Sequence, residues 1–219
     1  MVNRTKIDWA DFTVNPITGL CPVHCKDNNG KEYCYARRMY RRFRWDTTLK
    51  FKPSVYNDMP KKPARIFVGS TMEIFLFDDW LEYILNRCQD FPQHTFIFLT
   101  KRPKNLLKWS PFPLNAWVGV SAPNREMMLE GCRELEKVEA KVRFLSIEPM
   151  LENVWVLPST LVVSRIDWLI LGSRTQPIRH PPREWVEELI EAADIAKVKV
   201  FIKEPLASHY NIQRQEFPK

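Results

Sequence analysis

The sequence predicts an α/β fold of about six to seven parallel strands with helices outside them. Short and nearly continuous apolar runs recur along the chain, and segments with apolar residues three and four positions apart separate them. Strands that are apolar on both faces are typical of parallel sheets covered by helices. About seven such units suit a closed or partial barrel better than an open sheet.

The expected elements follow one another in a regular alternation. The strands are predicted over residues 11–18, 65–70, 95–100, 116–121, 142–149, 167–173 and 198–205. Helical spacing of apolar residues predicts helices over 80–91, 124–138 and 182–198, and a basic helix is expected after Cys34. No Gly-rich or Ser-rich stretch interrupts the alternation, so residues 1–219 are expected to form a single domain.

Composition and charge limit the class of protein. Hydrophobic residues make up 45% of the chain and charged residues 27%, which allows a sizeable core and argues against global disorder. No stretch approaches the roughly 18 apolar residues of a membrane helix, and the N-terminal sequence lacks the apolar run of a secretory signal. We therefore expect a cytoplasmic protein without membrane contact.

The net charge of +7 permits binding to nucleic acid or another polyanion. Much of the positive charge lies in residues 37–45, RRMYRRFRW, directly after Cys34. A solvated helix face and a functional basic patch are both compatible with this segment.

Three of the five cysteines are clustered. Cys21, Cys25 and Cys34 have the spacing C-x3-C-x8-C in a loop over residues 19–36, directly after the first expected strand. An odd number of cysteines in a chain without a secretory signal argues against a disulfide framework. Cys88 and Cys132 fall in helical patterns, where a small buried apolar residue is the simplest interpretation.

Three thiolates are one short of the four that close a structural zinc site or a cubane cluster. An iron with an open position can bind a further ligand, and this is the logic of radical S-adenosylmethionine chemistry. Zinc is the alternative, because His24 completes a Cys3His set on paper. Adjacent residues such as His24 and Cys25 rarely reach one metal together, and zinc knuckles pair two cysteine clips. The spacing therefore favours an iron–sulfur cluster over zinc.

Polar residues follow the expected strands from the second onward. In parallel βα folds, ligands bind at the carboxyl ends of the strands. Chains often turn polar at strand ends, but charged residues after so many buried strands favour a binding site. These residues are Ser70, Thr71 and Glu73; Thr100, Lys101 and Arg102; Ser121; Ser146 and Glu148; Gly172, Ser173 and Arg174; and Lys203 and Glu204.

Ordered blocks along nearly the whole chain carry a family resemblance. They read KIDWADFTVNPITGLCPV, CYARRMYRRF, RIFVGSTMEIF, PQHTFIFLTKRPKNL, AWVGVSAPN, VRFLSIEPML, IDWLILGSRTQP, PREWVEELIEAA and VKVFIKEPL. Through these blocks the chain resembles the phage Gp37/Gp68-like family (domain of unknown function 5131), a radical S-adenosylmethionine-like group. The resemblance implies an incomplete TIM-type barrel with a 4Fe–4S cluster and S-adenosylmethionine. The cysteine loop and a lysine after a middle strand are also similar to the spore photoproduct lyase group.

The chain departs from these patterns in two places. Radical enzymes usually have C-x3-C-x2-C, whereas KDNNGKEY separates Cys25 from Cys34 here. The turn formers Asn28, Asn29 and Gly30 would let the extra residues loop out and return Cys34 to the cluster. Many relatives have a Gly-Gly-Glu-Ser-like turn where this chain has residues 172–175, GSRT, so any role of that acid does not transfer.

The resemblance gives the candidate residues their expected roles. Cys21, Cys25 and Cys34 would ligate the cluster. Contacts to S-adenosylmethionine are expected from Tyr33, Ser70, Thr71, Glu73, Lys101, Arg102, Ser121 and Glu148, with Tyr33 beside the adenine. Glu148 closes a buried strand, so a structural role is also compatible. The catalytic candidates are Lys101, Lys203 and Glu204; the last two would serve the substrate or proton transfer, or form an ion pair that closes the barrel.

The leading functional hypothesis is an enzyme. It would cleave S-adenosylmethionine reductively, with the help of an electron donor, and the 5′-deoxyadenosyl radical would act on a nucleic acid or nucleotide. The alternatives are a zinc-stabilised nucleic-acid-binding protein without catalysis and a cluster-bearing redox partner.

Overall fold

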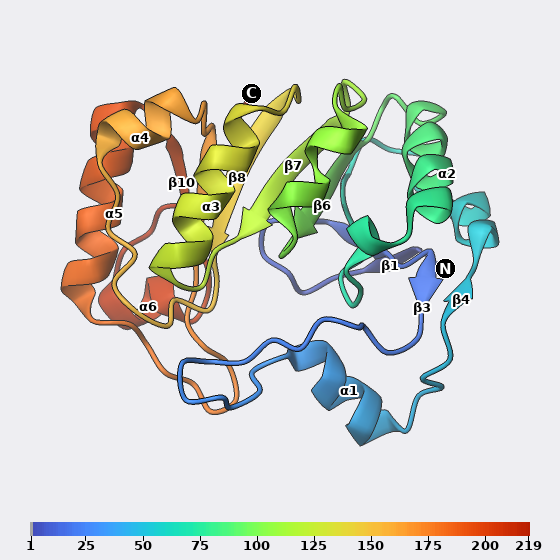
Figure 1. Ribbon diagram of the computed structural model, residues 1–219, viewed down its shortest axis with the longest axis horizontal. Helices are drawn as coiled ribbons and strands as arrows, with labels where there is room; N and C mark the ends of the chain where they lie inside the picture. The colour runs from blue at the N-terminus through green and yellow to red at the C-terminus, as the bar shows by residue number, and fades with distance from the viewer. Residues whose placement is uncertain (1) are drawn as a thin grey trace. The chain divides into compact units, whose positions relative to one another are not determined.

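The computed structural model describes residues 2–219 (Figure 1). The chain divides into two compact units, Met1–Phe98 and Leu99–Lys219. The boundary falls within strand β6 (Thr95–Thr100). Both units combine parallel strands with helices, as the sequence predicts for the α/β class. That they form a single domain stays a prediction.

The N-terminal unit places its strands in the order β1-β2-β5-β6. β1 is antiparallel to β2, while β2, β5 and β6 run parallel, with Val14 opposite Val68 and Val68 opposite Phe98. These three side chains are buried and form part of the core. The further elements are β1 (Val2–Arg4), β2 (Phe12–Val14), β5 (Arg65–Val68), the ribbon of β3 (Ile17–Thr18) and β4 (Lys50–Phe51), helices α1 (Tyr35–Phe43) and α2 (Asp78–Gln89), and the 3₁₀ turns η1 (Pro53–Asp58) and η2 (Ile74–Leu76).

The C-terminal unit is a run of regular strand–helix repeats, and β7, β8, β9 and β10 are parallel neighbours in that order. β7 is buried along its whole length, which is why its sequence is apolar throughout. Asn124 caps α3 by accepting the Met127 amide at 2.9 Å. The elements are β7 (Ala116–Ser121), α3 (Arg125–Glu136), β8 (Val142–Ile147), α4 (Pro158–Val163), β9 (Trp168–Leu171), α5 (Arg183–Ala196), β10 (Lys199–Ile202), α6 (Leu206–Tyr210), and the 3₁₀ turns η3 (Pro103–Asn105) and η4 (Leu107–Trp109).

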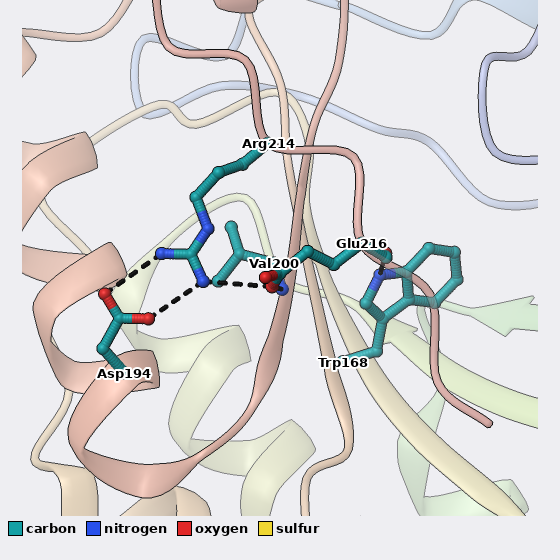
Figure 2. A network of polar contacts seen from close by, with 5 residues as sticks. All are labelled: Trp168, Asp194, Val200, Arg214 and Glu216. Atoms are coloured by element: carbon teal, nitrogen blue, oxygen red, sulfur yellow. Dashed lines mark hydrogen bonds and ion pairs between the residues drawn. The ribbon is translucent and has the colours of Figure 1, made fainter.

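The C-terminal tail is fastened to this unit by polar contacts (Figure 2). The guanidinium of Arg214 bonds both carboxylate oxygens of Asp194 on α5, at 3.0 and 2.9 Å, and lies 3.0 Å from Glu216. Glu216 accepts the Val200 amide through its carboxylate and the Trp168 indole N–H through its carbonyl, both at 2.9 Å. The tail therefore holds α5, β9 and β10 together.

The structure contains all the predicted strands, but one predicted strand is divided in two. The segment 11–18 breaks into β2 and β3 at Asn15 and Pro16, because proline has no amide to continue a ladder. Cys88 and Cys132 are buried on α2 and α3, as predicted. None of the helices within residues 2–219 is long and apolar enough to cross a membrane. β1, β4, α4 and α6 were not predicted, and all of them are short.

Candidate functional site

The cysteine loop leaves β3 through a backbone turn that only glycine suits. Gly19 has a φ of +112°, and an added Cβ would lie 2.6 Å from the carbonyl oxygen of Thr48. The Gly19 amide donates to the hydroxyl of Tyr40 on α1 at 2.8 Å, and the Leu20 amide donates to the Thr47 carbonyl at 3.0 Å. The loop therefore begins from a fixed position beside α1.

The long insert between Cys25 and Cys34 is a small hairpin. Lys26 and Glu32 form an antiparallel bridge, and the Asp27 carboxylate accepts the amides of Asn29 at 3.1 Å and Lys31 at 2.9 Å. Gly30 supplies the left-handed residue of the turn, with a φ of +75°. The Tyr33 amide then donates to the Cys25 carbonyl at 3.1 Å. The hairpin therefore loops out and returns Cys34 to Cys25, as the turn formers predict.

The three thiols differ in their surroundings. A hydrogen bond with Cys25 lowers the pKa of the Cys34 thiol to about 6 against the effect of burial, and the amides of Arg37 and Ala36 at the start of α1 lower it further. Burial raises the pKa of the Cys21 thiol, although its sulfur accepts the Glu73 amide at 3.4 Å. The charge of Cys34 also raises the pKa of the Cys21 thiol, so these two thiols lie near each other.

Sulfur chemistry and side-chain arrangement give different answers about a metal. Three cysteines on one loop, one with a thiol that ionises readily, are the donors that iron–sulfur clusters use. Within residues 2–219, no group of three or more His, Cys, Asp or Glu side chains has an arrangement that could hold a metal ion. The thiols instead hydrogen-bond to each other and to the backbone. Three thiolates are chemically suited to ligate an iron–sulfur cluster. To bind it, the cysteine side chains would have to leave these hydrogen bonds.

The basic helix α1 braces the cysteine loop. Arg37 donates to the Cys21 carbonyl at 2.5 Å and lies 3.7 Å from Glu32 of the hairpin. Arg41 forms an ion pair with the same Glu32. Part of the positive charge after Cys34 therefore has a local structural role. The interpretation of this helix as a solvated face alone is incomplete.

The loop after β5 brings three predicted residues to the cysteine loop's side of the N-terminal unit. Ser70 and Thr71 both bond to Asn15, at the end of β2, with distances of 3.2 to 3.5 Å. Tyr35, directly after Cys34, donates its hydroxyl to the Ser70 carbonyl. Glu73 is buried next to Cys21. Asn15 and Tyr35 were not predicted, although Asn15 stands at a strand end like the predicted residues.

Tyr33 lies beside the thiols. It is buried, and its pKa is raised by burial and by the charges of Cys25 and Cys34. A phenol in this place remains neutral and presents a flat ring next to the sulfurs.

The C-terminal unit pairs its predicted residues at strand ends. The Lys101 ammonium, after β6, donates to the Ser121 hydroxyl at the end of β7. Lys203, after β10, forms a largely buried ion pair with Glu148, after β8. Lys203 thus pairs with Glu148, and not with Glu204.

Two further residues of this unit with a predicted cofactor or catalytic role, Glu204 and Arg102, contact residues near them in the sequence. Glu204 is exposed, and its carboxylate accepts the amide and hydroxyl of Ser208 on α6. Arg102 is exposed, and its amide donates to the Thr100 hydroxyl at 2.8 Å. Their predicted roles stay predictions.

A serine–histidine pair at the end of β9 was missed. Ser173 is buried, and its hydroxyl lies 2.8 Å from Nδ1 of His180. The His180 ring stacks on His209 at 3.8 Å between centroids. Burial and the neighbouring His209 charge lower the pKa of His180. The histidine lies seven positions after the serine, and no spacing rule connects them.

The fold and the site define an α/β protein with a mostly parallel sheet and a three-cysteine loop. The chain belongs to a family described as proteins of unknown function, DUF5131, whose model matches residues 4–214. The predicted membership of domain of unknown function 5131 is therefore confirmed. None of the curated proteins matches the chain significantly in sequence.

The fold is similar to solved structures of spore photoproduct lyase. A complex of that enzyme with dinucleoside spore photoproduct has a TM-score of 0.58 at 13% identity, over 93% of this chain and 79% of the other. A mutant with bound AdoMet and dinucleoside spore photoproduct has a TM-score of 0.53 at 13% identity, over 89% of this chain and 64% of the other. The present chain thus spans less than two thirds of the length of that mutant chain. The likeness confirms the predicted fold class, an α/β incomplete TIM-type barrel.

Proposed function

We propose that the protein is a radical S-adenosylmethionine enzyme in which Cys21, Cys25 and Cys34 hold a 4Fe–4S cluster. The observation that carries the proposal is the hairpin that returns Cys34 to hydrogen-bonding contact with Cys25 despite the long insert. The likeness to a lyase solved with AdoMet supports it at the level of the fold.

When bound, such a cluster supplies one electron to the sulfonium of S-adenosylmethionine, which yields methionine and a 5′-deoxyadenosyl radical. The chain's own residues position these partners. Arg37 donates to the Cys21 carbonyl and the Glu73 amide donates to the Cys21 sulfur, while the buried Tyr33 lies close to Cys25 and Cys34. Ser70, Thr71 and Glu73 are our candidates for the amino acid part of S-adenosylmethionine.

Candidate contacts also come from the C-terminal unit. Lys101, Arg102, Ser121 and Glu148 are proposed for the cofactor, and Lys101, Lys203 and Glu204 for substrate and proton transfer. In the ion pair of Lys203 and Glu148, the ammonium can donate a proton and the carboxylate can accept one, which suits proton transfer. An external electron donor is required.

A nucleic acid or nucleotide is the proposed substrate class. The net charge of +7 supports it, and the similar lyase was solved with a dinucleoside photoproduct. The zinc alternative is less well supported, because Nε2 of His24 lies 3.4 Å from the Arg37 guanidinium, which competes with a metal for that nitrogen.

Anaerobic reconstitution of the full chain with iron and sulfide tests the proposal. We expect bound iron and sulfide, visible absorption of a cluster, and 5′-deoxyadenosine after dithionite and S-adenosylmethionine are added. Stoichiometric zinc without 5′-deoxyadenosine would overturn the proposal. A cluster that forms but never cleaves S-adenosylmethionine would instead favour a redox partner.

A further inference from the structure

The N-terminal unit contains a pocket of about 840 Å³, and most of its lining residues have no role in the proposed function. Its walls are β1, β2, the β3–β4 ribbon, α1 and the loop after β5, and they include Tyr35, the residue after Cys34. The volume lies in the upper part of the range of roughly 300–1,000 Å³ for small-molecule sites. It can therefore hold a ligand larger than a single small metabolite.

Lysines give the pocket a positive lining. Phe51 on β4 stacks on Trp80 at 5.5 Å, so the alternation of a strand turns Lys50 and Lys52 to the other side, where both line the pocket. Lys6 joins them from the segment after β1.

One acidic residue, Asp46, stands among the lining residues that the structure describes, and its carboxylate is held by Lys50 at 2.6 Å. Lys6 and Lys52 have no ion-pair partner within residues 2–219, so their charges are available to a ligand.

Aromatic and neutral polar groups complete the lining. Trp45 lines the pocket and is 42% exposed, while its indole is supported by Tyr40 at 5.2 Å and Phe43 at 5.5 Å. Thr13 and Asn15, two positions apart on β2 and just after it, offer a hydroxyl and an amide. Lysines around a supported flat ring are the combination that binds phosphates and stacks bases in single-stranded nucleic acid.

We propose that this pocket binds a single-stranded nucleic acid segment, with phosphates at Lys6 and Lys52 and a base against Trp45. The pocket shares Ser70 and Thr71 with the group assigned above to S-adenosylmethionine, and Asn15, which accepts from both, also lines it. The ligand would therefore lie next to the cofactor, and its place as substrate rests on the proposed function. S-adenosylmethionine itself suits the lysines poorly, because its sulfonium is a cation.

Fluorescence anisotropy of a labelled single-stranded DNA oligonucleotide, with reconstituted full-chain protein, tests the pocket. Trp45→Ala is expected to weaken binding roughly 5- to 150-fold, the cost of losing one stacked base. Trp45→Phe keeps a ring against Tyr40 and Phe43 and is expected to bind nearly as the native protein does.

The lysines are tested by a charge-matched pair of double variants. Lys6→Ala with Lys52→Ala is expected to lower the slope of log K against log salt by about 1.4, because each phosphate contact in a single strand contributes about 0.7. Lys61→Ala with Lys62→Ala removes the same charge from exposed positions outside the pocket and should leave the slope unchanged.

Three results would overturn the assignment: equal losses in the two lysine pairs, tighter binding of heparin than of the oligonucleotide, or displacement of the oligonucleotide by saturating S-adenosylmethionine. Normal 5′-deoxyadenosine formation without oligonucleotide binding would refute the pocket alone. Oligonucleotide binding without S-adenosylmethionine cleavage would refute the proposed function and leave the pocket standing.

Discussion

The two units build their candidate sites in different ways. In the C-terminal unit, Ser121, Glu148 and Lys203 each stand at or just after a buried parallel strand, and their positions follow from the strand–helix alternation. In the N-terminal unit, the cysteines stand on a loop that a hairpin, a left-handed glycine and Arg37 hold in place. A regular scaffold tolerates little change in packing, whereas a loop-built site depends on local hydrogen bonds and backbone conformation.

The largest expected effect comes from replacing one cysteine in each unit. Cys34→Ala removes a proposed ligand, so we expect loss of reconstituted iron and a fall in 5′-deoxyadenosine greater than the roughly 10- to 100-fold cost of losing a residue that only orients a ligand. Cys132→Ala changes a buried thiol on α3 and should keep its iron, at a cost of about 1 kcal/mol in unfolding free energy. Iron analysis and product chromatography measure both. Full iron in Cys34→Ala would break the comparison.

Substitutions at two glycines compare the cost of a packing change in the C-terminal unit with the cost of a backbone change in the cysteine loop. In the regular unit, a Cβ added at Gly119 would lie 2.4 Å from the Phe144 ring, and we expect Gly119→Ala to cost about 1–3 kcal/mol of global stability. In the hairpin, Gly30 has open space around it but a φ of +75°, so Gly30→Ala should cost about 1–2 kcal/mol within the hairpin alone.

Urea denaturation measures the global stability of the protein. The rate at which a chelator removes iron measures the local stability of the hairpin. The contrast holds if Gly119→Ala lowers the urea midpoint and Gly30→Ala mainly accelerates iron loss. It fails if Gly30→Ala lowers the urea midpoint as much as Gly119→Ala does.

The same difference explains which parts of the molecule the sequence could predict. Apolar runs mark β7 at Ala116–Ser121 without error, because a strand buried on both faces must be apolar throughout. The polar residues after such strands could be predicted by position. Asn15, Tyr35 and the Lys52 side of the β3–β4 ribbon could not, because their contacts depend on how short, non-periodic segments fold against each other. The Ser173–His180 pair was missed for the same reason.

The smallest expected effect concerns the tail of the regular unit (Figure 2). Burial raises the pKa of Glu216, but the Val200 amide and the Arg214 guanidinium outweigh it, so the net pKa lies below the ordinary value of 4.5. A lowered carboxyl pKa means that the stabilising contribution is complete above the unfolded value and is lost as the pH falls through the folded value. The Arg214 cation persists throughout, because its own pKa is raised by Asp194 and Glu216 despite burial.

We therefore expect Glu216→Gln to lower the unfolding free energy by roughly 0.5–1 kcal/mol at neutral pH, since solvent screens a side chain that is about one third exposed. The difference from the native chain should disappear as the pH falls below the folded pKa of Glu216, where the native carboxyl is also neutral. Asp194→Asn is the matched control, because it weakens the other arm of Arg214 and leaves the Glu216 carboxylate to titrate. Urea unfolding at neutral and acidic pH decides the matter. A deficit in Glu216→Gln that is independent of pH would show that the tail, like the cysteine loop, is held by backbone geometry rather than by charge.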